Sequence, residues 1–326
     1  MRWLALLLLL PLLTSCTALP AEERAFAVAL MVDKADDTWR VHARIPTYKT
    51  GGGYVTVRGE GASPDAALAD MDAAAPMHIH LSQLRLLVLD AALGREAYAV
   101  LTALSNRADM RPQCAVAATQ SPADAVMEAL QPATGARLSK GLDVLLDTRT
   151  AQGGILPSPL SRIVRMGERQ SPVLTAMTVT DGAIDLAGGW AMGAAGLIPL
   201  TAEETALLAL LHGDVKDVTL RLSGGTAHVR DAAVKAVLQS DERSVHVTLT
   251  MTAVASALTS GGLEAALAED SMMLLARLYR EGCDALGLGR QAILGASDMA
   301  GWHALDWPGV LPQLQWTVSV GVSGPA

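Results

Sequence analysis

Residues 244–253 carry the pattern that most restricts how this chain can fold. Apolar and polar side chains alternate strictly along this segment, with one set made of Val245, Val247, Leu249 and Met251 and the other of His246, Thr248, Thr250 and Thr252. A period of two residues indicates a strand with one buried and one solvated face, as in an antiparallel sheet. Residues 314–322 show the same alternation, so a second strand is expected near the end of the chain.

The segments around these strands predict an α+β second half. Thr201 and Glu204 form a capping box that opens a helix through Leu211. Two further strands are expected at residues 215–222 and 226–234, and a long helix at residues 263–286. The second half is therefore expected to hold a sheet of about four strands packed with helices.

Strands and helices alternate in the first half. Strands at residues 39–45 and 54–59, separated by Gly51–Gly53, predict a hairpin. Ser63 is the expected N-cap of a helix over residues 64–75. Residues 84–89 are apolar apart from Arg85 and predict a buried strand. A strand or short helix is expected at 24–32, further strands at 114–119 and 173–179, and further helices at 93–105, 122–130, 139–146 and 160–167.

The fold class that follows is α+β and multi-domain. A mixed N-terminal α/β region precedes a C-terminal antiparallel sheet packed with helices, one of them long. A chain of 326 residues fits about two domains on a prior of ~150 residues each. The glycine-rich stretch that runs from Asp181-Gly182 through the glycines at 188, 189, 193 and 196 is the best candidate boundary. We expect an N-terminal region at 24–185, with two subdomains as an option, and a C-terminal domain at 186–326.

The first residues have the layout of a processing signal. Met1 and Arg2 precede the apolar run Trp3–Leu13, which is too short to cross a bilayer because a spanning helix needs ~20 residues. A positive charge, a short apolar run and small residues after it are typical of a secretory signal peptide. Residues 1–15 are therefore expected to be removed, leaving a water-soluble body outside the cytoplasm.

The end of this signal is more specific than its apolar run. Leu13-Thr14-Ser15-Cys16 resembles a bacterial lipobox, in which the cysteine is acylated and becomes the first residue. The competing interpretation is an ordinary signal peptide with a chance cysteine at position 16. Because acyl chains contribute ~0.8 kcal/mol per buried CH₂, several of them on Cys16 would hold the body stably on a membrane. Residues 16–23 would then form a lipidated linker.

Composition excludes several classes of protein. Hydrophobic residues make up 51% of the chain and charged residues 18%, which is too apolar for a disordered protein. The 33 acidic against 25 basic residues give a net charge of −8, which repels nucleic acid. Three cysteines cannot form a disulfide scaffold; Cys114 and Cys283 could pair, or could equally be two buried thiols. Phe26 is the single phenylalanine, so the core is aliphatic.

Residue patterns that would support catalysis or metal binding are weak. His78 and His80 would share one face of a strand, but no third ligand stands at a recognisable spacing and Zn²⁺ takes three or four. The segment Gly295–Met299 fails the nucleophile-elbow pattern at its last position. The glycines at 51–53 and 188–196 fit neither nucleotide-binding pattern. Three acidic pairs read as solvated faces or a helix start: Asp36-Asp37, Glu203-Glu204 and Glu269-Asp270. We therefore expect no catalytic, cofactor or metal site.

Several short motifs follow one another in a defined order. They are the lipobox, Arg24–Lys34, Gly59-Glu60-Gly61, Leu84–Leu89, Leu200–Thr205 with Leu207–Gly213, the long helix, Leu286-Gly287-Leu288-Gly289, Trp302, Asp306-Trp307 and a strand after Pro312. In number and order they resemble the Ger(x)C family of spore germination lipoproteins, the C subunits of nutrient germinant receptors. The chain departs from that pattern at Leu288, where the family has an aromatic residue.

The resemblance implies a function without catalysis. It implies an accessory subunit anchored through Cys16 on the outer face of the spore inner membrane, with a multi-pass A-type subunit and a transporter-like B-type subunit as partners. The runner-up hypothesis is a solute-binding lipoprotein associated with a transporter, which needs two similar lobes around a polar cleft. An enzyme is the third hypothesis and would need His80 clustered with acidic residues in one concave site.

Overall fold

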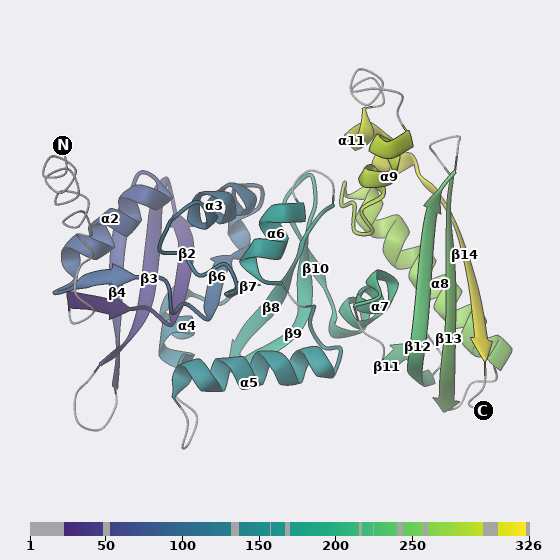
Figure 1. Ribbon diagram of the computed structural model, residues 1–326, viewed down its shortest axis with the longest axis horizontal. Coiled ribbons are helices and arrows are strands. Elements are labelled where there is room, and N and C mark those ends of the chain that lie inside the picture. The colour runs from purple at the N-terminus through teal and green to yellow at the C-terminus, as the bar shows by residue number, and fades with distance from the viewer. Residues whose placement is uncertain are drawn as a thin grey trace, which may run out of the picture.

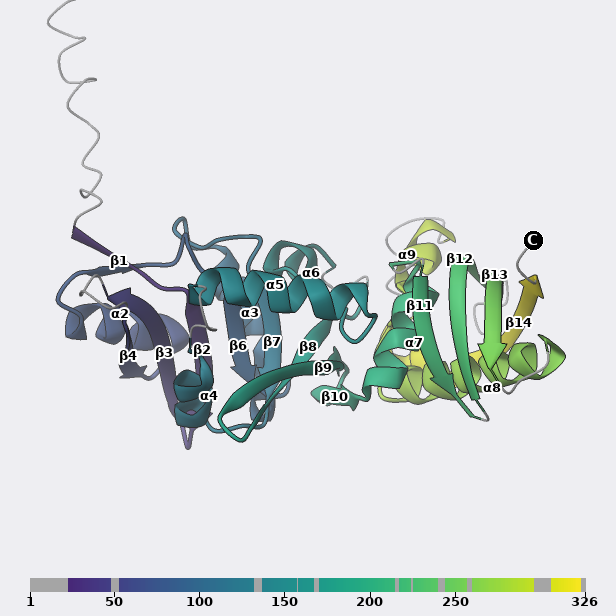
Figure 2. The same ribbon diagram turned by 90° about the horizontal axis from the view of Figure 1, so that it is seen from below.

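The computed structural model describes residues 23–47, 53–131, 137–156, 158–166, 170–214, 217–223, 225–239, 244–256, 260–295 and 306–323. These residues form two units that lie side by side along the longest axis of the molecule (Figure 1). Strands β1 (Arg24–Phe26) and β14 (Gln315–Ser323) lie at opposite ends of it (Figure 2). The expected leader and Cys16 fall outside the described residues. No helix among the described residues is long and apolar enough to cross a membrane.

The first unit is built on an eight-stranded sheet, as far as the described residues show. In spatial order its strands are β10 (Leu197–Leu200), β9 (Ala183–Met192), β8 (Val173–Thr180), β7 (Ala115–Thr119), β6 (Leu86–Asp90), β2 (Ala29–Ala35), β3 (Thr38–Thr47) and β4 (Gly53–Gly61). Strands β8, β7, β6 and β2 run parallel at the centre, and the outer strands pair antiparallel. Strand β1 pairs separately with β5 (His78–His80).

Helices cover both faces of this larger sheet, which explains the apolar run at Leu86–Leu89. One face packs against α2 (Pro64–Ala74), α3 (Glu96–Ser105) and α6 (Leu160–Met166), and the other against α4 (Ala123–Ala129) and α5 (Leu138–Ala151) (Figure 1). All four side chains of Leu86–Leu89 are fully buried. Central parallel strands covered on both sides read as continuous apolar segments rather than as alternating ones.

Ser63 and the glycines of β4 place α2 on the sheet. The Ser63 side chain accepts a hydrogen bond from the Ala66 backbone N–H at 3.1 Å, as expected of an N-cap. A Cβ atom on Gly59 would overlap the backbone of Ala67 and Met71. The Gly59-Glu60-Gly61 motif therefore lets the helix approach the strand closely.

The second unit holds a four-stranded sheet within the described residues. Its order is β11 (Asp217–Leu222), β12 (Gly225–Leu238), β13 (Ser244–Ser256) and β14, with α8 (Ser260–Arg280) packed along one face (Figure 2). The apolar set of β13 is buried and its polar set faces outward, which confirms the predicted alternation. The α+β fold class is confirmed.

Strand direction in this smaller sheet differs in part from the expectation. Strands β11, β12 and β13 are antiparallel, but β14 pairs parallel with β13. A parallel pair needs a crossover connection, and the chain supplies one through α8, α9 (Leu288–Gly295) and α11 (Trp307–Val310). The sheet is therefore mixed, because α8 returns the chain to the end at which β13 began.

Two predicted boundaries fall elsewhere in the structure. The long helix ends at Arg280, not at residue 286, because Gly282 adopts a φ of +73° and closes it. The N–H of Gly282 bonds to the Tyr279 carbonyl and that of Cys283 to the Leu278 carbonyl, which is a Schellman motif. Residues 185 and 186, the expected domain boundary, lie inside β9, so sheet pairing carries the first unit on to β10.

Gly59→Ala is expected to lower the free energy of unfolding by about 1–3 kcal/mol, because the added methyl group forces α2 away from β4. Urea denaturation checks this. The matched control is Gly261→Ala in the first turn of α8, where a Cβ meets nothing within 4 Å. That change is expected to be neutral or slightly stabilising. Equal urea midpoints for the two variants would contradict the conclusion that Gly59 lets α2 approach β4 closely.

Candidate functional site

The start of α7 (Ala202–His212) carries the paired acidic residues Glu203 and Glu204. The Thr201 side chain accepts a hydrogen bond from the Glu204 backbone N–H at 3.1 Å, and Glu204 Oε2 accepts one from the Thr201 N–H at 2.9 Å. The predicted capping box is thus present. The second oxygen, Glu204 Oε1, accepts a hydrogen bond from Arg277 Nη2 of α8 at 2.6 Å. One carboxylate therefore caps α7 and joins it to α8.

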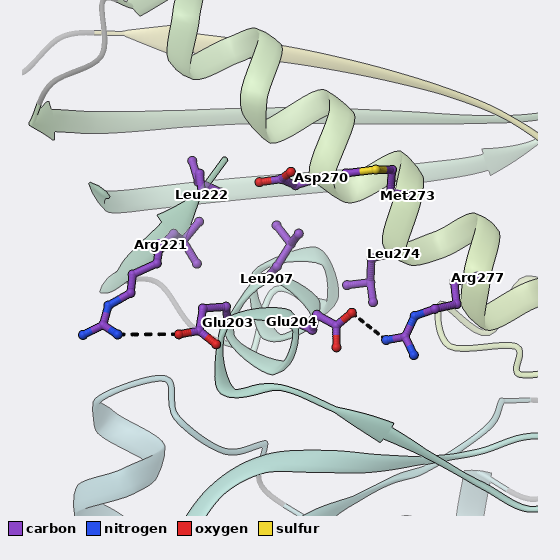
Figure 3. A pocket seen from close by; sticks show the side chains of 10 residues that line it. Glu203, Glu204, Leu207, Arg221, Leu222, Asp270, Met273, Leu274 and Arg277 are labelled. Atoms are coloured by element: carbon purple, nitrogen blue, oxygen red, sulfur yellow. Dashed lines mark hydrogen bonds and ion pairs between the residues drawn. The ribbon is translucent and has the colours of Figure 1, made fainter. Parts of the chain in front are cut away.

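A cavity of about 330 Å³ opens between α7, α8 and β11, and we call it the α7–α8 hollow (Figure 3). Its base is aliphatic, formed by Leu207, Leu220, Leu222 and Leu274. Met273 of α8 stands at its edge with 54% of its surface exposed. An apolar base of this kind favours the binding of an apolar group, because moving apolar surface out of water is favourable.

Charged side chains form the rim of the α7–α8 hollow. Glu203 points toward Arg221, with 3.6 Å between Oε1 and Nη1 (Figure 3). Asp270 accepts two hydrogen bonds from Ser223, from the backbone N–H at 3.1 Å and from Oγ at 3.0 Å. The rim groups are thus already engaged with neighbouring groups, and the hollow fits an apolar group with polar edges better than a fully charged ion.

Glu204→Ala is expected to lower the free energy of unfolding by about 1–2 kcal/mol, because it removes a helix cap and an ion pair together. Glu203→Ala is the matched control. Its carboxylate is exposed and 3.6 Å from Arg221, so the change should stay within about 0.5 kcal/mol. Chemical denaturation of the two variants checks this. A decrease in the free energy of unfolding for Glu203→Ala as large as that for Glu204→Ala would contradict it.

A second polar centre surrounds Asp284, whose side chain is buried behind α8. Its carboxylate accepts four hydrogen bonds, from Tyr279 Oη at 2.6 Å, the Leu288 N–H at 2.8 Å, the Gly289 N–H at 2.7 Å and Trp307 Nε1 at 3.3 Å. Burial raises the pKa of Asp284 above its usual value, while these donors oppose the rise. Asp284 thereby holds α8, the start of α9 and α11 together.

This centre explains the glycine motif near the end of the chain. Gly287 has a φ of +70°, and a Cβ atom on Gly289 would lie 2.7 Å from Trp307 Nε1 and 3.0 Å from Asp284 Oδ2. Leu288, which lies between the two glycines, is fully buried. Gly289 thus gives the Asp284 carboxylate and the Trp307 ring room to meet, whereas Gly287 supplies a left-handed backbone position beside Gln170.

The backbone around Asp284 also holds the second unit to the first. The Asp284 N–H bonds to Ser171 Oγ at 2.9 Å, and the Ser171 N–H bonds to the Asp284 carbonyl at 3.0 Å. Gln170 Nε2 donates to the Ala285 carbonyl at 3.1 Å, and the Ala194 N–H to the Glu281 carbonyl at 3.0 Å. Residues 281–285 therefore form one bridge between the two units.

Asp284→Asn is expected to destabilise the protein by about 2 kcal/mol, because the amide NH₂ then faces N–H and O–H donors in a buried site. Urea denaturation measures it. Asp306→Asn is the control, since Asp306 has a φ of +47° that asparagine tolerates and its side chain does not cap α11. If Asp284→Asn lowers the free energy of unfolding no more than Asp306→Asn does, the role of this carboxylate is contradicted.

The residues that the sequence singled out are not brought into one site. His78 Nδ1 lies 2.9 Å from Asp72 Oδ2. His80 Nδ1 lies 2.9 Å from Ser82 Oγ, and the His80 ring packs on Phe26. The described residues contain no group of three or more His, Cys, Asp or Glu side chains placed to hold a metal ion.

Cys114 and Cys283 are unpaired and buried, so of the two alternatives the structure shows the buried thiols. Burial raises the pKa of each thiol to about 12. A thiol that stays protonated near neutral pH is a poor nucleophile. Both side chains therefore serve as small core residues.

Asp284 and Arg277 are the functional positions that sequence reasoning missed. Arg277 lies on the expected long helix, but Glu204 is far from it in the sequence, so no local pattern predicts that the two residues pair. Asp284 was expected inside that same helix. The available signal was Asp284 standing just before Leu286-Gly287-Leu288-Gly289, because an aspartate followed by a glycine-rich helix start is a capping pattern.

Comparison with known proteins agrees with this architecture. The family model described as the spore germination protein N-terminal domain matches residues 18–179, about half of the chain. A solved structure, described as the crystal structure of the GerBC protein, is similar with a TM-score of 0.55 and 15% sequence identity. The match covers 90% of this chain and 96% of that one, which shows a shared fold over both units. None of the curated proteins matches the sequence.

Residues 18–179 thus match a spore germination protein N-terminal domain, which covers the first unit as far as β8. The chain belongs to the Ger(x)C family of spore germination proteins.

Proposed function

We propose that this protein is a C-type subunit of a nutrient germinant receptor and that it acts without catalysing a reaction. The observation that carries the proposal is the combination of a spore germination domain at residues 18–179 with a fold shared with the GerBC protein over 90% of the chain. The Asp284 centre and the α7 and α8 sides of the α7–α8 hollow are built from residues of the ordered motifs. The side chains of those motifs therefore stabilise the second unit and line the α7–α8 hollow on its surface.

Membrane attachment is the second part of the proposal. The sequence Leu13-Thr14-Ser15-Cys16 supports acylation of Cys16 after removal of residues 1–15. Strand β1 begins at Arg24, eight residues after Cys16, so an extended linker of this length reaches at most about 29 Å. The lipid would thus keep the body close to the outer surface of the spore inner membrane. Multi-pass A-type and transporter-like B-type subunits would then be near neighbours, at a raised effective concentration.

The alternative of a solute-binding lipoprotein receives no support from the two units. It calls for two similar lobes, whereas the first unit has an eight-stranded sheet with helices on both faces and the second a four-stranded sheet with α8 on one, within the described residues. No observation favours it over the receptor subunit.

Cys16→Ser is expected to abolish acylation, because a serine hydroxyl does not replace the thiol that receives the diacylglyceryl group. Labelled palmitate incorporation and sedimentation with membranes check this in whole cells. The adjacent change Thr17→Ala leaves the lipobox intact and should keep both signals. A Cys16→Ser protein that still carries the label would overturn the assignment of the lipid site.

The receptor role is tested in spores that depend on this receptor alone. Deleting the gene should abolish germination with nutrients, and the wild-type and Thr17→Ala proteins should restore it, whereas Cys16→Ser should restore it poorly. Normal nutrient germination after deletion would sink the proposal. Normal germination with Cys16→Ser would remove only the need for a lipid anchor.

A further inference from the structure

The sheet of the second unit ends at β14, a strand of nine residues that has no neighbour on its outer side within the described residues. Its sequence, Gln-Trp-Thr-Val-Ser-Val-Gly-Val-Ser, contains no charged residue and no proline. The outer backbone groups of such a strand are a template for pairing with another strand. We call the outer side of Gln315–Ser323 the β14 edge.

One hydrogen bond shows which backbone groups of β14 point outward. The Val322 N–H donates to Glu264 Oε1 of α8 at 2.9 Å, so it does not face β13. Because backbone groups alternate in direction along a strand, the N–H and C=O groups of Trp316, Val318 and Val320 also face outward. None of these groups has a partner in the part of the chain that the structure describes. Glu264 thus closes the edge at Val322 and leaves the three residues before it open.

The other strands at the edges of the two sheets carry features that oppose pairing. Strand β4 has Arg58 and Glu60, and the Glu60 N–H is already bound by Asp70 Oδ2 at 2.9 Å. Strand β10 is four residues long and contains Pro199. Strand β11 carries one acidic and one basic residue. Charges, proline and short length are the usual protection of a sheet edge, and of these four edges β14 is the one without them.

The apolar side chains of β14 remain partly exposed at this edge. Trp316, Val318 and Val320 pack on the core of the second unit, and the Trp316 ring meets the Tyr279 ring edge-on with 4.6 Å between centroids. They are only partly buried, whereas the apolar set of β13, which has a strand on each side, is buried. A further strand beside β14 would remove this remaining apolar surface from water.

We infer that two copies of this chain associate through the β14 edge, with the two β14 strands antiparallel across a two-fold axis at Val318. In this register Trp316 pairs with Val320 of the second copy and Val318 pairs with its own counterpart, so every open residue finds a backbone partner. A register moved by two residues would either leave Val320 without a partner strand or set Trp316 against the capped Val322.

The side chains of β14 fit a second copy of the same strand. On the α8 face the register sets Trp316 beside Val320, and an aromatic residue next to a β-branched one is a stabilising cross-strand pair. On the outer face it sets Thr317 opposite Ser319, where the two hydroxyls can share a hydrogen bond. Each copy has a net charge of −8, and pairing through β14 brings no like charges of the two strands together.

The inference goes beyond the proposed function and does not depend on it. Association is measured on the protein itself, whereas the receptor role is tested in spores, so either can fail without the other. A contact one strand wide belongs to the small interfaces, below ~1,200 Å², which are typical of transient complexes. We therefore expect a pair that dissociates on dilution.

Sedimentation velocity of the full-length protein in detergent should show a monomer that becomes a dimer as its concentration rises. Thr317→Lys combined with Ser319→Lys sets ammonium groups opposite one another and should weaken association at least about tenfold, or ~1.4 kcal/mol. Adding a copy with Thr317→Glu and Ser319→Glu should restore pairing. Both positions are exposed, and thermal unfolding verifies that the variants fold. Thr219→Lys, on an exposed position of β11 at the opposite edge of the sheet, is the control and should associate like the wild type.

Cysteine variants test the register in membranes. Thr317 and Ser319 of the second copy form a pair with ~4.5 Å between Cα atoms, which a disulfide spans. Copies with Thr317→Cys, expressed together with copies that carry Ser319→Cys, should therefore form a disulfide-linked dimer on mild oxidation. Either variant alone should cross-link poorly, because its counterpart lies on the diagonal at ~7–8 Å. Cys114 and Cys283 are buried, and the wild-type protein gives the background.

Three results would overturn the inference. The first is a folded wild-type protein that stays monomeric over the whole concentration range. The second is a dimer that survives Thr317→Lys with Ser319→Lys, which would place the contact on another surface. The third is a Thr317→Cys protein that cross-links in membranes to a different protein and not to the Ser319→Cys copy, which would show that the β14 edge binds another chain.

Discussion

The buried carboxylate of Asp284 is the interaction on which the arrangement of the second unit depends. Four donors from three separate stretches of chain converge on it, and its own backbone pairs with Ser171 of the first unit. A buried charge is stable only when its hydrogen bonds are satisfied, so each donor has to arrive in place. The short segment that follows α8 therefore organises one unit and attaches it to the other at the same time.

Helix α7 makes a second connection of the same kind. It follows directly after β10 of the larger sheet, and Glu204 at its start binds Arg277 of α8. Arg277 also donates to the Pro199 carbonyl in β10 at 3.3 Å. The two sheets are thus linked by polar contacts at defined points in addition to the aliphatic core of the second unit, and the charged rim of the α7–α8 hollow is part of that link.

Local patterns in the sequence were sufficient for what depends on neighbouring residues. The alternation of β13, the capping box at Thr201 and the buried run at Leu86–Leu89 all appear as expected. A period of two residues specifies which side chains are buried but not the direction of the neighbouring strand, so the parallel pairing of β14 was missed. The Asp284 centre and the α7–α8 hollow depend on residues far apart in the sequence, and no spacing rule brings them together.

The position of β1 at one end of an elongated body has a mechanical consequence (Figure 2). With Cys16 as the point of attachment, as we propose, the body is a rod held near one tip. Small rotations about that tip move the smaller sheet through a wide arc and β1 through a narrow one. A protein that binds the second unit therefore restricts the orientation of the whole body. The same contact made beside β1 would leave the body free to rotate about its point of attachment.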